Sequence, residues 1–177
     1  MSFLREHLKN NEIILLDGGV STEIQQRGVA MDKNVWSGVA HKFHPEVLLQ
    51  VHEDYIRAGA QVITANTFST ARHVLESLDL GSEVKTINTQ AVQLANAARD
   101  NAAKDETWIA GSMSSMAPFN SLQEVASGEK VANNYQELAE ILVEAGVDLI
   151  IAEMMRDHEN AHLVIEAALS TGLPVWI

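Results

Sequence analysis

The sequence contains no cysteine among its 177 residues. Disulfide bonds and thiolate metal ligands are therefore excluded within these residues. Basic residues are also scarce, because 12 Lys and Arg stand against 24 Asp and Glu and give a formal net charge of −12. Binding to a nucleic-acid backbone needs clustered Lys and Arg, so we expect no nucleic-acid partner.

Long hydrophobic runs are missing as well. No stretch approaches the roughly 18 consecutive apolar residues of a membrane helix, and the first residues lack the apolar core of a secretory signal. The composition that remains, 46% hydrophobic and 20% charged residues, is typical of a soluble globular protein. We therefore expect no membrane partner and a cytoplasmic location, with a length that suits one domain.

Five short apolar runs recur along the chain, each followed by small or polar residues or by the end of the sequence. They cover residues 13–16, 61–65, 107–110, 148–152 and 175–177. These runs lack alternating polar residues, which predicts strands covered on both faces, as in a parallel sheet. Between these runs, apolar residues recur at helical spacing, which predicts helices. Ser21, Thr22 and Gln25 predict a capping box at the start of a short helix that ends at Gly28.

A repeated joint between helix and strand indicates how these elements are ordered. Residues 55–63 resemble residues 142–150, since in both an amphipathic helix ends at Ala-Gly and a strand begins two residues later. Serial βα units predict an α/β fold, a (β/α)8 TIM barrel of which the chain covers about the first four and a half βα units. A doubly wound open sheet is the alternative, disfavoured because no Gly-x-Gly-x-x-Gly follows the first run.

The last apolar run, residues 175–177, is typical of the opening of a buried strand. We therefore expect residues 1–177 to be the N-terminal part of a single barrel domain, and the natural protein to continue past Ile177.

In either architecture, ligands gather at the carboxyl ends of the strands. This rule selects Asp17, Gly18, Gly19, Asn66, Thr67, Gly111, Ser112 and Glu153. Asp17 offers a carboxylate to a cationic group, and the two glycines after it let the backbone approach a ligand closely. A turn in which Asp17 binds backbone amides explains the same residues equally well.

The other candidates also have two interpretations. Glu153 closes an otherwise apolar strand, where ligand binding is favoured over an ion pair with Arg156. Asn66 could bind a polar substrate or satisfy neighbouring loop amides. Trp36 could form a pocket wall, although burial in the core is favoured on the residues alone.

Two histidine pairs have a spacing that can chelate a metal, His41 with His44 and His158 with His162. Both pairs fall where solvated helix or loop surfaces are expected, and neither has a neighbouring cysteine. We assign no metal ligand in this sequence.

The motifs together resemble the homocysteine S-methyltransferase family. Residues 17–28, DGGVSTEIQQRG, resemble its first-strand signature. The resemblance continues in order through residues 36–37, 45–46, 52–55, 58–60, 64–68, 110–112, 146–149, Glu153 and 172–176. It covers nearly the whole chain, which makes it specific at the level of the family.

The resemblance implies a barrel enzyme that transfers a methyl group to the thiol of homocysteine and so gives methionine. Carried over residue by residue, Asp17, Gly18 and Glu153 help to hold the amino acid, a charge-assisted contact for its ammonium group. Trp36 is a candidate for the pocket wall, and Asn66, from its place at a strand end, completes the predicted substrate-binding set.

The resemblance also implies zinc, which in this family binds the thiol and favours the nucleophilic thiolate. The family's zinc ligands are cysteines on later strands, and this sequence has none. Zinc is therefore expected for the complete family domain, with its ligands absent from this chain.

The expected partners are homocysteine and a methyl donor, which these residues leave open among S-methylmethionine, S-adenosylmethionine, betaine and a methylfolate. Two other functions remain open. One is a non-catalytic amino-acid-binding half barrel, for which an exposed strand edge at residues 175–177 would favour a homo-oligomer. The other is a different TIM-barrel enzyme that uses Asp17 and Glu153 as acid and base.

Overall fold

The computed structural model describes residues 6–7, 9–103, 105–115, 128–156 and 158–177. In these residues a four-stranded sheet has the order β1-β2-β3-β4, and each neighbouring pair of strands is parallel. The strands are β1 (Val62–Thr64), β2 (Trp108–Ser114), β3 (Leu149–Glu153) and β4 (Val175–Trp176). The prediction of an α/β chain with a parallel sheet is confirmed, and closure into a barrel stays a prediction.

The first predicted strand, residues 13–16, is reduced to a single bridge between Leu16 and Val62. Ile13 is 82% exposed and Leu15 is 51% exposed. In the described part of the chain, the backbone of this segment bonds the sheet only from Leu15 onward, through residues 61 and 62. The prediction of a full strand here is wrong, because an apolar run forms a buried strand only where it has a neighbour along its length.

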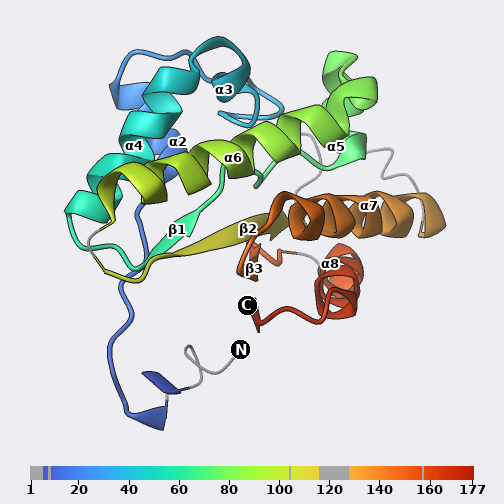
Figure 1. Cartoon of the computed structure of the whole chain (residues 1–177). Coiled ribbons are helices and arrows are strands. Elements are labelled where there is room, and N and C mark those ends of the chain that lie inside the picture. The colour runs from blue at the N-terminus through green and yellow to red at the C-terminus, as the bar shows by residue number, and fades with distance from the viewer. Residues whose placement is uncertain (1–5, 8, 104, 116–127, 157) are drawn as a thin grey trace.

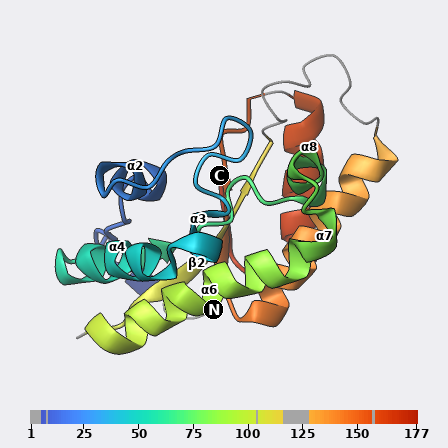
Figure 2. The same cartoon turned by 90° about the horizontal axis from the view of Figure 1, so that it is seen from above.

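Helices connect the strands and cover the sheet (Figure 1). They are α2 (Val20–Gln26), α3 (Ala40–Phe43), α4 (Pro45–Arg57), α5 (Arg72–Leu75), η1 (Glu76–Leu78), η2 (Gly81–Glu83), α6 (Val84–Ala102), α7 (Glu129–Ala145) and α8 (His158–Ser170). Helix α6 packs against both α4 and α7 (Figure 2), and α8 packs against α7 and β3. No helix among the described residues is long and apolar enough to cross a membrane.

Helix α7 shows how the sequence produces these elements. Val131, Tyr135, Leu138 and Leu142 recur at helical spacing and are all buried. The helix ends at Gly146, whose φ of +91° lies in the left-handed region that glycine adopts without steric cost. The predicted helix-to-strand joint is confirmed here.

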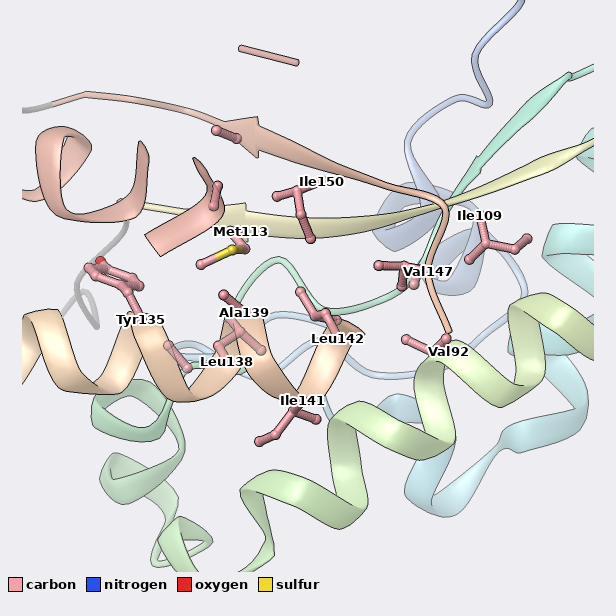
Figure 3. Close-up of a cluster of buried hydrophobic side chains, with 14 of the residues drawn as sticks. Val92, Ile109, Met113, Tyr135, Leu138, Ala139, Ile141, Leu142, Val147 and Ile150 are labelled. Carbon is pink, nitrogen blue, oxygen red and sulfur yellow. The ribbon is translucent and has the colours of Figure 1, made fainter. Parts of the chain in front are cut away.

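One face of the sheet packs against the helices. Ile63, Ile109, Met113 and Ile150 alternate along the strands and join buried residues of α4, α6, α7 and α8 in one hydrophobic cluster. Figure 3 shows part of this cluster, in which side chains of α7 point toward Met113 and Ile150. The main core of the chain therefore lies between the sheet and a single layer of helices.

The opposite face of the sheet carries a second, smaller cluster. Its buried members are Val62, Trp108, Ala110, Leu149 and Ile151, with Ile14 and Trp176 packed against them. None of these side chains comes from a helix that the structure describes. A doubly wound sheet would have helices on both faces, so this one-sided arrangement favours the predicted barrel over that alternative.

The predicted capping box is wrong. Helix α2 begins at Val20, and Gly19 precedes it without a side-chain hydrogen bond. Ser21 therefore lies inside the helix, where its hydroxyl shares a hydrogen bond of 2.6 Å with the hydroxyl of Ser37. A contact with a distant residue replaces the local cap that the sequence pattern predicts.

Two histidines are buried in the helical layer. His52 is fully buried, and neither of its ring nitrogens has a hydrogen-bond partner among the described residues. Burial lowers the pKa of His52 to about 3, with a further contribution from nearby His41. Burial also lowers the pKa of His41 to about 4, partly offset by the backbone of Ile87.

Both histidines make the fold sensitive to acid. Their pKa values in the folded chain lie below the ordinary value of 6.5, so the unfolded state takes up more protons as the pH falls. We expect the contribution of these two histidines to the free energy of unfolding to decrease as the pH falls from about 6.5 to 4. Urea titrations at a series of pH values should show a smaller decrease for His52→Leu. The same substitution at exposed His44 should leave the pH dependence as it is, and an equal slope in all three proteins would contradict this explanation.

Candidate functional site

Polar side chains occupy the carboxyl ends of the strands on the face without helices. Thr64 lies two residues after Val62 in β1, and Glu153 lies two residues after Ile151 in β3. Because strand side chains alternate between faces, both continue the face of the smaller cluster. Ser112 has the same orientation in β2. The face is therefore apolar along most of its length and polar where the strands end.

Asp17 is bound to the end of β1 by two hydrogen bonds. The backbone N–H of Thr64 donates to Oδ2 of Asp17, and the Thr64 hydroxyl donates to Oδ1, both at 2.8 Å. Burial raises the pKa of Asp17 to about 6, although the bonds from Thr64 act in the opposite direction and Glu153 adds a smaller rise. Asp17 therefore binds a backbone amide, as one of the two interpretations of the sequence predicted. It also faces a cavity.

Glu153 is oriented by Ser112, whose hydroxyl donates to its Oε2 over 2.5 Å. Ser112 is fully buried, so this donor comes from the interior of the sheet. No ion pair between Glu153 and Arg156 forms among the described residues. Arg156 is exposed, and its backbone N–H donates to Ser115. The alternative interpretation of Glu153, an ion pair with Arg156, is therefore wrong.

A cavity of about 440 Å³ opens at this end of the sheet. Its lining comprises Leu16, Asp17, Gly18, Gly19, Val20, Ser21, Thr22, Trp36, Thr64, Ala65, Asn66, Phe68, Glu153 and Met154. All five predicted substrate-binding residues, Asp17, Gly18, Trp36, Asn66 and Glu153, are thus brought to one cavity. Their role in binding stays a prediction. Among the described residues, the lining contains two carboxylates and no Lys or Arg, which makes the cavity suited to a cationic group.

Aromatic side chains form one wall of the cavity. The rings of Trp36 and Phe68 are stacked, with centroids 5.4 Å apart and an interplanar angle of 20°. Trp36 is therefore at the cavity and not in the main core, contrary to the favoured interpretation of the sequence.

Gly18 allows the backbone to pass close to helix α4. A Cβ atom at this position would lie 2.7 Å from the hydroxyl oxygen of Tyr55, which is closer than real Cβ contacts. A side chain at Gly18 would therefore displace either Tyr55 or the turn that carries Asp17.

Three other predicted positions have structural contacts. The Asn66 side chain accepts a hydrogen bond from the Ser37 hydroxyl at 3.0 Å and donates to the Ser37 carbonyl at 2.7 Å. The Thr67 hydroxyl bonds the backbone of Ser112. Gly111 lies under α7, since a Cβ atom there would be 2.9 Å from Cδ1 of Leu142.

Among the residues that line the cavity and that sequence reasoning missed are Thr64, Phe68 and Met154. Thr64 could have been found, because it is the polar residue two positions after Val62 and so faces the same side as Glu153. Phe68 and Met154 lie in turns after strands, where no periodic pattern indicates the direction of a side chain. Met154 also has a left-handed φ of +50°, which is unusual for a residue other than glycine.

The described residues contain no group of three or more His, Cys, Asp or Glu that could hold a metal ion. His162 instead lies 3.1 Å from Glu166, one turn further along α8. His41 is buried, whereas its predicted partner His44 is exposed. The residues that the structure describes therefore do not fit a zinc ion.

Comparison with known proteins adds a second kind of observation. The family profile described as homocysteine S-methyltransferase matches residues 14–177. Betaine–homocysteine S-methyltransferase 1 of Bos taurus is 31% identical over 173 residues, which cover 96% of this chain and 41% of that protein. Homocysteine S-methyltransferase of Escherichia coli (strain K12) is 31% identical over 189 residues, which cover 97% of this chain and 58% of that protein.

Solved structures give the same relationship. The metallated form of the homocysteine methyltransferase MmuM from Escherichia coli superposes with a TM-score of 0.78 at 26% identity, covering 98% of this chain and 65% of that one. Its apo form gives a TM-score of 0.68 at 27% identity, with 98% and 62% covered. The chain thus spans between two-fifths and two-thirds of the length of these relatives.

The raised pKa of Asp17 means that its charge is unfavourable in the folded chain without a cation. Its folded pKa of about 6 lies above the ordinary 3.8, so the contribution to stability falls as the pH rises through this range. We expect Asp17→Asn, which can still bond Thr64, to raise the free energy of unfolding at pH 8 by about 1–3 kcal/mol and not at pH 3.5. Urea titration at both pH values measures this. Asp100→Asn on the exposed side of α6 serves as the control, and a gain at pH 3.5 equal to that at pH 8 would refute the assignment.

Proposed function

Because the chain belongs to the homocysteine S-methyltransferase family, we propose that it serves in the transfer of a methyl group to the thiol of homocysteine, with methionine as the product. One observation carries this proposal at the level of residues. Asp17 and Glu153, each oriented by a hydrogen bond from the sheet, face one cavity, and none of the described residues that line it is Lys or Arg.

We propose that this carboxylate pair binds the ammonium group of homocysteine. The bond from Ser112 uses Oε2 of Glu153, so Oε1 can accept a hydrogen bond from the substrate. Each oxygen of Asp17 accepts one bond from Thr64 and has a further lone pair. A bound ammonium group would favour the ionised form of Asp17 and form charge-assisted hydrogen bonds in a site partly shielded from water.

The rest of the cavity suits the other parts of an amino acid. Gly18 and Gly19 leave the backbone at the cavity wall, where amide groups can donate to the substrate carboxylate. The stacked rings of Trp36 and Phe68 provide an apolar surface for the methylene groups of the side chain. The thiol itself requires activation, because the nucleophile in methyl transfer is the thiolate.

Zinc, which the family resemblance implies for the complete domain, does not fit the residues described in this chain. We assign no step of the reaction to it here. The role proposed for this chain is recognition and orientation of the amino acid. The methyl donor stays open, since the name of the Bos taurus relative specifies betaine for that protein alone.

We further propose that the sheet is part of a (β/α)8 barrel, in which residues 1–177 are the N-terminal part of one domain. The sequential strand order and the single layer of helices support this proposal. The TM-score of 0.78 to MmuM supports it as well. In this arrangement the face that carries Asp17 and Glu153 points into the barrel mouth, where barrel enzymes bind their ligands.

The proposal is tested by the affinity of the chain for homocysteine. We expect Glu153→Gln to weaken the binding of L-homocysteine about 10- to 100-fold, because a charge-assisted contact to the ammonium group is lost. Isothermal titration calorimetry should also show that the parent chain prefers homocysteine to 4-mercaptobutanoic acid, which lacks the amino group. Glu153→Gln should lose most of this preference.

Glu159→Gln, on exposed α8, is the matched control and should bind like the parent. If Glu153→Gln weakens both ligands equally, the carboxylate does not recognise the ammonium group. If the parent binds neither ligand, the proposed role of the cavity is wrong.

A further inference from the structure

Trp36 forms the aromatic wall of the cavity from a backbone conformation that few residues adopt. Its φ of +52° lies in the left-handed region, which is unfavourable for a bulky side chain. Such a conformation persists only where the surrounding structure fixes it. The backbone of Trp36 forms two hydrogen bonds with the backbone of Asp32, at 3.1 Å and 2.9 Å, and the contacts of its two neighbours add to this local turn.

The residue before Trp36 is held by Ser69. The Ser69 hydroxyl donates to the carbonyl oxygen of Val35 at 2.6 Å, and both residues are buried. Gly38 packs closely on this bond, because a Cβ atom there would lie 2.8 Å from Oγ of Ser69 and 3.0 Å from the Val35 carbonyl oxygen. The loop and Ser69 are thus in close contact.

The residue after Trp36 is held by Asn66. The Asn66 amide donates to the Ser37 carbonyl at 2.7 Å and accepts from the Ser37 hydroxyl at 3.0 Å. Asn66 is 5% exposed and Ser37 is 1% exposed, so water does not compete with this pair of bonds. Two side chains from the segment after β1 therefore fix the backbone on either side of Trp36.

The same segment also supports the ring and the opposite wall. Phe68 stacks on Trp36, and its carbonyl oxygen accepts a bond of 2.6 Å from the hydroxyl of Ser114 in β2. Thr67 bonds the backbone of Ser112, the residue that orients Glu153. Residues 66–69 thus connect the aromatic wall to the strand that positions a carboxylate.

We propose that Ser69 and Asn66 are positioning residues, which hold Trp36 in its left-handed conformation so that its ring forms the substrate wall. Ser69 does not line the cavity, so it acts through the loop and not by contact with a ligand. For Asn66 this role explains both of its hydrogen bonds. The effect on ligand affinity rests on the proposed binding of homocysteine, whereas the effect on the ring does not.

The position of the ring is tested in the chain labelled with 5-fluorotryptophan, by ¹⁹F NMR without ligand. The three tryptophans give three resonances, and Trp36→Phe assigns the relevant one. We expect Ser69→Ala and Asn66→Ala each to shift and broaden the Trp36 resonance. The resonances of Trp108 and Trp176 should not move, which shows that the variants are folded.

Ser77→Ala is the matched control, since the Ser77 hydroxyl also donates to a backbone carbonyl, that of Val74, at 2.7 Å. It should leave all three resonances in place. If Ser69→Ala is unfolded, Ser69→Cys keeps the size of the side chain with a weaker donor and should produce a smaller shift of the same resonance. An unchanged Trp36 resonance in the folded Ser69 and Asn66 variants would overturn the proposal.

A double-mutant cycle tests the consequence for binding. Ser69→Ala should weaken homocysteine binding about two- to tenfold, the range that follows from the loss of one hydrogen bond. In a Trp36→Gly background, where glycine adopts the left-handed conformation freely, the same substitution should have no further effect. An equal loss in both backgrounds would show that Ser69 acts independently of Trp36. If the parent does not bind homocysteine, the proposed function fails while the NMR result still decides the positioning role.

Discussion

The two hydrogen bonds from Thr64 to the carboxylate of Asp17 fix the start of the chain on the sheet. The segment before Asp17 meets β1 through a single bridge at Leu16, and Ile13 and Leu15 remain largely exposed. The carboxylate adds to the backbone hydrogen bonds that Leu15 and Asp17 form with residues 61 and 62, and it reaches further along the strand, to Thr64, where the cavity opens. The Asp17 carboxylate, whose charge is unfavourable when buried, thus helps to position the site. Its burial reduces the stability of the fold at the place where the ligand is expected to bind.

The site is built from two sets of side chains with different tasks. Asp17 and Glu153 provide charge, and each is oriented by a donor that belongs to a strand. The segment of residues 66–69 provides no charge and instead connects neighbouring walls through short, buried hydrogen bonds. Because these bonds are shielded from water, small changes in them are transmitted to the cavity with little relaxation.

Periodicity in the sequence was sufficient to find the end of β3, and hence Glu153, because a buried strand is recognisable from its own residues. Asp17 was found because it follows an apolar run, although that run does not form a full strand. Periodicity failed at residues 13–16, since the number of neighbours of a strand is not encoded locally. The left-handed conformation of Trp36 was also not predicted, because its loop contacts Ser69 and Asn66, which are distant in the sequence, as well as nearby Asp32. Local rules identify which groups are present, whereas tertiary contacts decide what they face.

The charge of the cavity connects binding with stability. Two carboxylates face one space in a chain of net charge −12, and burial raises the pKa of Asp17 to about 6. The folded chain therefore holds a carboxylate whose ionised form is less favourable than that of an ordinary Asp. A cation that enters the cavity removes this penalty, whereas a neutral ligand of the same shape does not. In the proposed function, selection for an amino group would thus follow from the burial of Asp17 as much as from the contact of Glu153 with the substrate.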